Sequence, residues 1–416
     1  MKPMPFFKIF SALILAIAMM AQPLLTGCSA DSQLDCEIDH IVEDQKFSIL
    51  DWEIEALTQL LDDVIFDKTE ADVGNVEIVI EYFDNRQTIS TLEQKLALIQ
   101  EGVIEGDAGY FEQQITPLAE RNQIILPSVQ NIIAAQIESV FAEIGIINPW
   151  QHIYEETSLF PPINFVIQPP PHLLVISPRD QITRYKDITL AQEMTDEQKE
   201  AIEEEISLTG MSGLIVSLGG IATYPAFVAD TMSLYNTIDV AVEEWFHQYL
   251  FFRPLGFRYG MHVAGVIHDY EIATVNEALA GMVSSEITSL VWERYYQETM
   301  TTTANVASAS ANEFDFYAEM REIRLAVDEL IENGKIEEAE QYMEERRLYI
   351  LANGYYIRKL NQAYFAFHGT YASSPGSVSP IGSGLRNLRQ QQPSLKDFID
   401  LVSSMTNADE IIAAAD

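Results

Sequence analysis

The sequence predicts a mostly helical α+β fold, in which a small mixed sheet lies between two helical regions. Apolar residues recur three and four positions apart over residues 51–146 and again after residue 312, the spacing that places them on one face of a helix. Between these regions, residues 161–190 are rich in proline and β-branched residues, which is typical of short strands separated by breaks. Hydrophobic residues make up 48% of the chain, so it can bury a core despite its many charges.

The chain begins with a pattern typical of a secretory signal. Residues 1–28, MKPMPFFKIFSALILAIAMMAQPLLTGC, open with two lysines, and an apolar run follows from residue 9 to residue 20. The ending LTGC resembles the lipobox of bacterial lipoproteins. This resemblance implies cleavage after residue 27, acylation of Cys28 and an extracytoplasmic protein anchored by lipid to a bacterial membrane. The alternatives are an ordinary signal peptide or an uncleaved anchor. No other segment has about 18 uninterrupted apolar residues, so no second membrane crossing is expected.

Cysteine content and charge narrow the possibilities further. Cys28 and Cys36 are the only cysteines, so lipid on Cys28 would leave Cys36 without a disulfide partner. A Cys28–Cys36 bridge is possible if Cys28 is not acylated. Without the signal and its two lysines, the chain carries 22 basic against 63 acidic side chains, a net charge of −41. Such a charge repels phosphate backbones, so no nucleic-acid partner is expected.

Shifts in composition divide the chain into five parts and a linker. The N-terminal helical periodicity ends where the proline-rich stretch begins, and the low-complexity stretch MTTTANVASASA separates the middle of the chain from the last helices. The parts are a signal peptide (1–27), a polar tether (28–45), a helical N-terminal domain (46–147), an α+β core (148–299) and a helical C-terminal subdomain (312–416).

The core is expected to alternate strands and helices. Thr195, with Gln198 three residues later, forms a capping box that begins a helix. Residues 212–228 then indicate two short strands around a Gly-Gly pair. A helix is expected from residue 233 to residue 252, where a following proline ends it. A glycine-containing loop and a second helix over residues 271–298 complete the core.

The helix at 233–252 carries the stretch Glu243-Glu244-Trp245-Phe246-His247. Positions i and i+4 lie on one helix face a turn apart, so Glu243 and His247 can bind one metal ion. Glu244 is placed to take a proton from a metal-bound water, as the glutamate of the zinc-peptidase pattern H-E-x-x-H does. Catalytic zinc needs a third protein ligand and an open fourth position, and Glu277 on the next helix offers that ligand.

Residues 210–298 resemble the gluzincins, the thermolysin-like and zinc-aminopeptidase clans. The resemblance rests on EEWFH and on Asn276-Glu277-Ala278, because those families place their third ligand in an Asn-Glu pair on the helix after the motif helix. It implies a zincin-like core, one divalent ion (zinc first) held by Glu243, His247 and Glu277, and Glu244 as general base. It also implies a peptide or protein substrate that pairs with an edge strand in GGIATYPAFV. The sequence departs from the family in that Glu243 replaces the first histidine, which favours harder ions, and the two helices are further apart along the chain.

Other interpretations of these residues stay open. His262 or His268, between the two helices, could complete the metal shell instead. Glu244-x-x-His247 also fits a di-iron helix bundle, but the only other histidine with a glutamate three residues before it is His40, in the tether. In a chain with 63 acidic residues, the motif could equally be a helix with acids on its solvated face.

One later segment carries further candidate groups. In residues 360–372, Tyr364 and His368 share a helix face with other aromatic residues, which is typical of a core stripe. The functional interpretation is that Tyr364 or His368 donates to a transition-state oxyanion across a cleft between the core and the C-terminal subdomain.

Taken together, these residues predict a membrane-anchored extracytoplasmic metallohydrolase, a peptidase, in which Glu244 activates a metal-bound water. Two hypotheses compete with this prediction. One is a catalytically inactive zincin-like surface lipoprotein that acts in binding or scaffolding. The other is a helical binding module without a metal.

Overall fold

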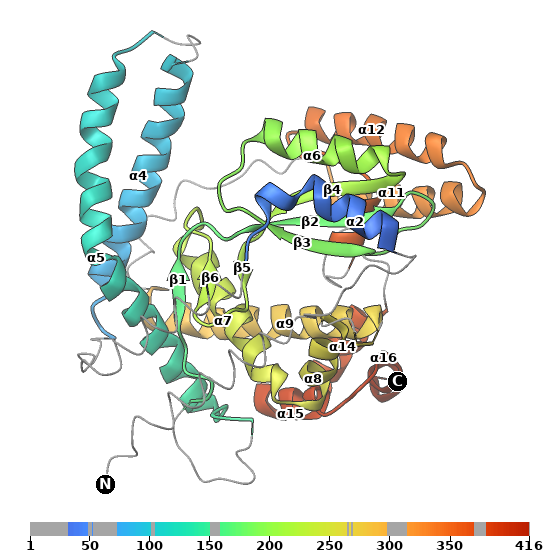
Figure 1. The fold of residues 1–416 in the computed structure, drawn as a ribbon. Coiled ribbons are helices and arrows are strands. Elements are labelled where there is room, and N and C mark those ends of the chain that lie inside the picture. The colour runs from blue at the N-terminus through green and yellow to red at the C-terminus, as the bar shows by residue number, and fades with distance from the viewer. Residues whose placement is uncertain are drawn as a thin grey trace.

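The computed structural model describes residues 32–48, 52, 73–100, 105–149, 159–263, 266–267, 269–297, 314–369 and 380–415. Helices dominate this part of the chain, and its strands form two sheets of three strands each, so the predicted mostly helical fold with a small mixed sheet is confirmed. Figure 1 shows a long helical hairpin beside two lobes, one built on the antiparallel sheet and one built of helices. The signal and Cys28 lie outside the described residues.

The hairpin consists of α4 (Val76–Gln100) and α5 (Ala108–Ile144). Asp107 caps the start of α5 by accepting a hydrogen bond from the Gly109 amide, and Gly145 ends the helix in the left-handed conformation with a φ of 77°. The helix passes through Pro117 and Pro127 without a break. By length and composition α5 could cross a membrane, and 44% of its apolar window is buried inside the protein.

The sheet lobe is built on an antiparallel sheet in the order β3-β2-β4. Its strands are β2 (His172–Pro178), β3 (Lys186–Leu190) and β4 (Met211–Ser217). Side chains alternate between its faces, so Leu174 packs under α6 (Asp196–Leu208) while Val175 packs under α13 (Gln362–His368). The predicted capping box of Thr195 and Gln198 is present at the start of α6.

The polar tether predicted at 28–45 is corrected by the structure. Its described part forms α2 (Ser32–Ile41) and a short 3-10 turn, η1 (Glu43–Gln45). Ile38 and Val42 are fully buried against the sheet face that α6 also covers. So few apolar residues in a polar stretch give no periodic signal in the sequence, but the sheet supplies the partner that makes the helix stable.

The helical lobe holds the predicted motif helices around a smaller mixed sheet. That sheet has the order β1-β6-β5, with β1 parallel and β5 antiparallel to β6. Its strands are β1 (Phe165–Ile167), β5 (Gly220–Ile221) and β6 (Ala226–Val228). The helices are α7 (Leu234–Phe251), α8 (Pro254–Val263) and α9 (Tyr270–Tyr295).

The glycine-containing loop predicted between the motif helices is wrong, because most of that segment forms helix α8. Pro254 ends α7 as expected, but it also stands at the first position of α8, where its missing N–H costs nothing and its fixed φ suits a helix. The two motif helices are therefore joined by a third helix, which packs on both of them.

The C-terminal helices join two different cores. Helices α11 (Phe316–Glu332) and α12 (Ile336–Ala352) form a hairpin whose core includes Phe365 of α13, beside the sheet lobe. The last helices share a core with α7 and α9 in the helical lobe. These are α14 (Ile381–Gln391), α15 (Leu395–Ser403) and α16 (Ala408–Ala415). Figure 1 shows this separation, with α11 and α12 above α9 and α14–α16 below it.

Candidate metal centre

Three of the predicted site residues converge between α7 and α9. Glu243 and His247 project from the same face of α7, and Glu277 faces them from α9. One ligand atom from each lies within 4.8 Å of the other two, and His247 Nε2 is 3.7 Å from Glu277 Oε2. The helices meet here because their apolar faces share one core, which includes Phe246 of α7 and Leu279 of α9. This cluster could hold one metal ion.

Asn276 orients the histidine. His247 Nδ1 lies 2.6 Å from Asn276 Oδ1, so the ring donates its Nδ1 proton there. The remaining nitrogen, Nε2, then presents its lone pair to the two glutamates, as a metal ligand must. Asn276 is fully buried, and its Nδ2 has no hydrogen-bond partner among the described residues.

The side chains of the candidate ligands are largely shielded from solvent. The side chains of His247 and Glu277 are only 11% and 13% exposed. The pKa of Glu243 is raised to about 7, chiefly by burial; the charge of His247 opposes the rise, and those of Glu277 and Asp239 add to it. Buried carboxylates this close repel one another, and a divalent cation would relieve that repulsion.

Glu244 lies beside the cluster, beneath β5. Burial raises the pKa of Glu244 well above its ordinary value, and the charges of Glu243 and Glu277 add to the effect. The strand above it approaches closely because position 220 is glycine. A β-carbon on Gly220 would come within 2.5 Å of both Glu244 Oε1 and Val240 Cγ1.

This close approach gives the first prediction. Gly220→Ala is expected to lower the free energy of unfolding by about 1–3 kcal/mol, because Val240 is branched and Glu244 is enclosed, so neither can yield freely. Gly219→Ala is the matched control, since its β-carbon would meet the flexible end of Met232 at 2.8 Å and Val240 Cγ2 at an ordinary contact distance of 3.8 Å. Urea unfolding of the two variants measures the difference, and equal losses would contradict the packing described for β5.

Two residues of the sheet lobe lie close to α8. Arg184 pairs with Asp187, with Nη2 and Oδ2 2.6 Å apart, and its guanidinium lies 5.4 Å from the ring centre of Phe367 on α13. The charge of Arg184 lowers the pKa of Tyr259 on α8, which burial otherwise raises. Burial also raises the pKa of Asp187, and the charge of Arg184 opposes the rise.

Of the auxiliary residues named from the sequence, the three that the structure describes lie outside the ligand group. His262 is on α8, where its Nδ1 accepts a hydrogen bond from the Asp269 amide at 3.0 Å. His268 is outside the described residues. Tyr364 and His368 lie against each other on α13, with ring centres 4.2 Å apart and ring planes tilted by 44°, and among the described residues no hydrogen bond joins them to the cluster. Burial lowers the pKa of His368 to about 4, so this histidine is neutral at pH 7.

Tyr259 is a residue that the sequence analysis missed. Its hydroxyl donates to Glu277 Oε1 at 3.0 Å, and its ring lies 6.3 Å from that of His247. The residue falls in the segment interpreted as a loop, where no side-chain direction could be predicted. The proline at position 254, followed by apolar residues, was the available signal for a helix there.

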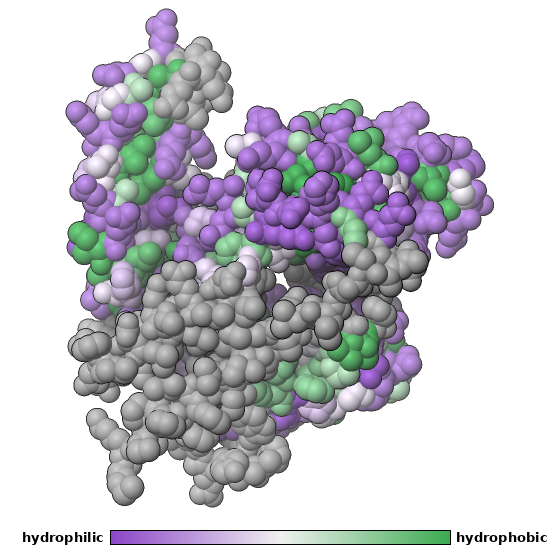
Figure 2. Space-filling view, viewed as in Figure 1, coloured by the Kyte–Doolittle hydropathy of each residue, from purple (hydrophilic) through white to green (hydrophobic). Residues whose placement is uncertain are grey.

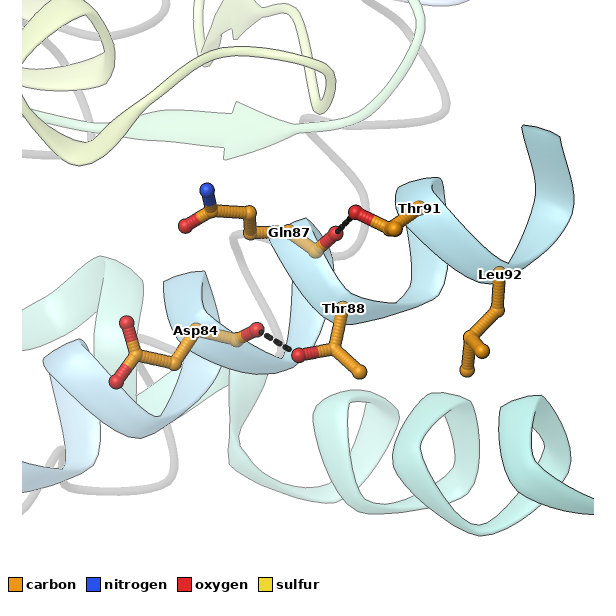
Figure 3. A pocket seen from close by; sticks show the side chains of 5 residues that line it. All are labelled: Asp84, Gln87, Thr88, Thr91 and Leu92. Carbon is orange, nitrogen blue, oxygen red and sulfur yellow. Dashed lines mark hydrogen bonds between the residues drawn. The ribbon is translucent and has the colours of Figure 1, made fainter. Parts of the chain in front are cut away.

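A shallow depression on the hairpin is a weaker candidate for a site. It has a volume of about 490 Å³ and is lined from α4 alone by Asp84, Gln87, Thr88, Thr91 and Leu92. Figure 3 shows that the hydroxyls of Thr88 and Thr91 donate to carbonyls of the same helix and that the Gln87 amide points away from them. Since these polar groups do not converge, the depression has no evident ligand chemistry.

Comparison with protein-family models, with curated proteins and with solved structures finds no match to this chain.

Proposed function

We propose that the protein is a metal-dependent hydrolase that cleaves peptide bonds and is held at a membrane through lipid on Cys28. The observation that carries the proposal is the convergence of Glu243, His247 and Glu277, with Glu244 alongside. The sequence pattern predicted this group, although its members come from two helices about thirty residues apart along the chain. A solvated acidic helix face would not need its carboxylates buried or its histidine fixed by a buried asparagine.

The donor set supports one divalent ion, with zinc as the first choice. Zinc accepts one imidazole nitrogen and two carboxylate oxygens, and three protein ligands leave a position for water. A bound ion would supply the positive charge that makes water acidic and that polarises a carbonyl oxygen. Glu244 would take the proton of the attacking water and pass it to the leaving amine.

The substrate class follows from the strand above the site. β5 is hydrogen-bonded to β6 on one side, and among the described strands nothing pairs with its other side. An extended peptide could pair with that edge. Because Gly220 lies close to Glu244, the backbone of the bound peptide would then be near the general base.

The test is whether the purified protein contains one divalent ion per chain and cleaves an unfolded protein substrate. Cleavage should stop when a chelator removes the ion and return when Zn²⁺ is added, because the ion is needed for the water to react. Elemental analysis and a fluorescent casein assay measure the two outcomes, and mass spectrometry of the N-terminal peptide tests acylation of Cys28. An ion without cleavage would favour the inactive, binding lipoprotein, and a protein without an ion would contradict the proposal.

A further inference from the structure

Helix α8 is tied to α9 by three contacts, and one of them reaches a ligand. Arg258 Nε donates to Asp269 Oδ2 at 2.9 Å, and the Asp269 amide donates to His262 Nδ1 at 3.0 Å. Asp269 also caps α9 by accepting from the Ile272 amide. The third contact is the 3.0 Å hydrogen bond from the Tyr259 hydroxyl to Glu277 Oε1. Two contacts therefore fix the first turn of α9, and the third fixes a side chain two turns later.

The Tyr259 hydrogen bond decides which oxygen of Glu277 faces the cluster. A glutamate side chain has several rotamers of similar energy, and its carboxylate can rotate. With Oε1 accepting from Tyr259, Oε2 is the oxygen that lies 3.7 Å from His247 Nε2. The Tyr259 ring also lies beside the His247 ring, with ring centres 6.3 Å apart.

We propose that Tyr259 is a positioning residue that holds the Glu277 carboxylate in its ligand orientation and thereby sets the affinity of the site for a divalent ion. The proposal rests on the metal site of the proposed function but does not depend on hydrolysis. A hydroxyl that orients a ligand restricts its rotamers before the metal binds, so less side-chain entropy is lost on binding. Removing one such partner typically lowers metal affinity about 10- to 100-fold.

The test compares Tyr259→Phe with Tyr296→Phe in the full chain. Both variants lose one tyrosine hydroxyl and its hydrogen bond, but Tyr296 donates to Gln136 at the far end of α9. Chelator competition with Zn²⁺ gives the affinity, and the visible spectrum of the Co²⁺ form reports the coordination. We expect Tyr259→Phe to bind Zn²⁺ about 10- to 100-fold more weakly and to alter the Co²⁺ spectrum, whereas Tyr296→Phe matches the wild type in both.

The possible results separate this inference from the proposed function. Wild-type affinity and spectrum in Tyr259→Phe would overturn the inference, as would equal losses in both variants, which would indicate general destabilisation. A wild-type protein that binds Zn²⁺ but hydrolyses nothing would end the hydrolase proposal, while the ratio of affinities would still decide the role of Tyr259. A wild-type protein that binds neither Zn²⁺ nor Co²⁺ would overturn both.

Discussion

Replacing Glu244 with glutamine is expected to reduce hydrolysis by a factor of about 10² to 10⁴ and to leave the metal content at one ion per chain. Glutamine has the shape of glutamate but cannot accept a proton from water. Glu244 lies next to the three ligands without being one of them, so the ion should stay bound. Its pKa is raised by burial and by two neighbouring carboxylates, which makes it a stronger base than an exposed glutamate once it is ionised.

Glu293→Gln is the matched control for this variant, because Glu293 is exposed near the end of α9 and should have no influence on the reaction. The turnover rate on a peptide substrate and the metal content of all three proteins are the measurements. Full activity in Glu244→Gln would show that another group takes the proton. Loss of the ion from this variant would instead show that Glu244 is a ligand.

Replacing His247 or Glu277 with alanine is expected to abolish metal binding. Each substitution leaves two protein ligands, and two ligands hold a divalent ion poorly. His172→Ala is a suitable control, since His172 is also buried but contacts Ser217 in the antiparallel sheet. Titration with Zn²⁺ followed by calorimetry measures the binding. Binding that survives the loss of Glu277 would mean that the ion, if present, lies elsewhere.

Glu243→His is expected to strengthen zinc binding, whereas the alanine variants abolish it. Imidazole is a softer donor than carboxylate, so this variant should bind Zn²⁺ more tightly and Mg²⁺ more weakly than the wild type does. The affinities for the two ions, measured in parallel, give the change in preference. An unchanged preference would argue that Glu243 is not in contact with the ion.

Local signals predicted several elements of the fold correctly. The capping box of Thr195 and Gln198 is decided by four consecutive residues, and it begins α6 as expected. The two motif helices were predicted to within a few residues, because their apolar periodicity and the proline at 254 are local features. The apolar side chains of both motif helices face the same core, because this periodicity places them on one face of each helix.

Elements whose stability comes from distant partners were not predicted. Helix α2 is short and polar, and it is stabilised where the sheet lobe buries Ile38 and Val42. The division of the C-terminal helices between two lobes likewise depends on which apolar surfaces the sheet and α9 leave uncovered. Neither surface can be deduced from the C-terminal residues themselves.

The sheet lobe shows how strongly tertiary context can act on a single residue. Glu203 of α6 is fully buried, where it accepts from Arg358, Lys359 and the Ile215 amide. In the sequence it is one of several acids on a helix that appears solvated. In the view of Figure 2 hydrophilic residues predominate on the surface of this lobe, with hydrophobic residues scattered among them.

The same division applies to the candidate site. The sequence by itself determined that Glu243, Glu244 and His247 share one region of a helix, because the helical period is fixed by the backbone. The sequence also named Glu277 as a candidate third ligand, through its Asn-Glu pair. Only the tertiary structure decided that Glu277 meets the other two, that Asn276 fixes the tautomer of His247 and that Tyr259 holds the carboxylate. These distances depend on how α7, α8 and α9 pack, and packing is set by side-chain shapes far apart in the chain rather than by a local repeat.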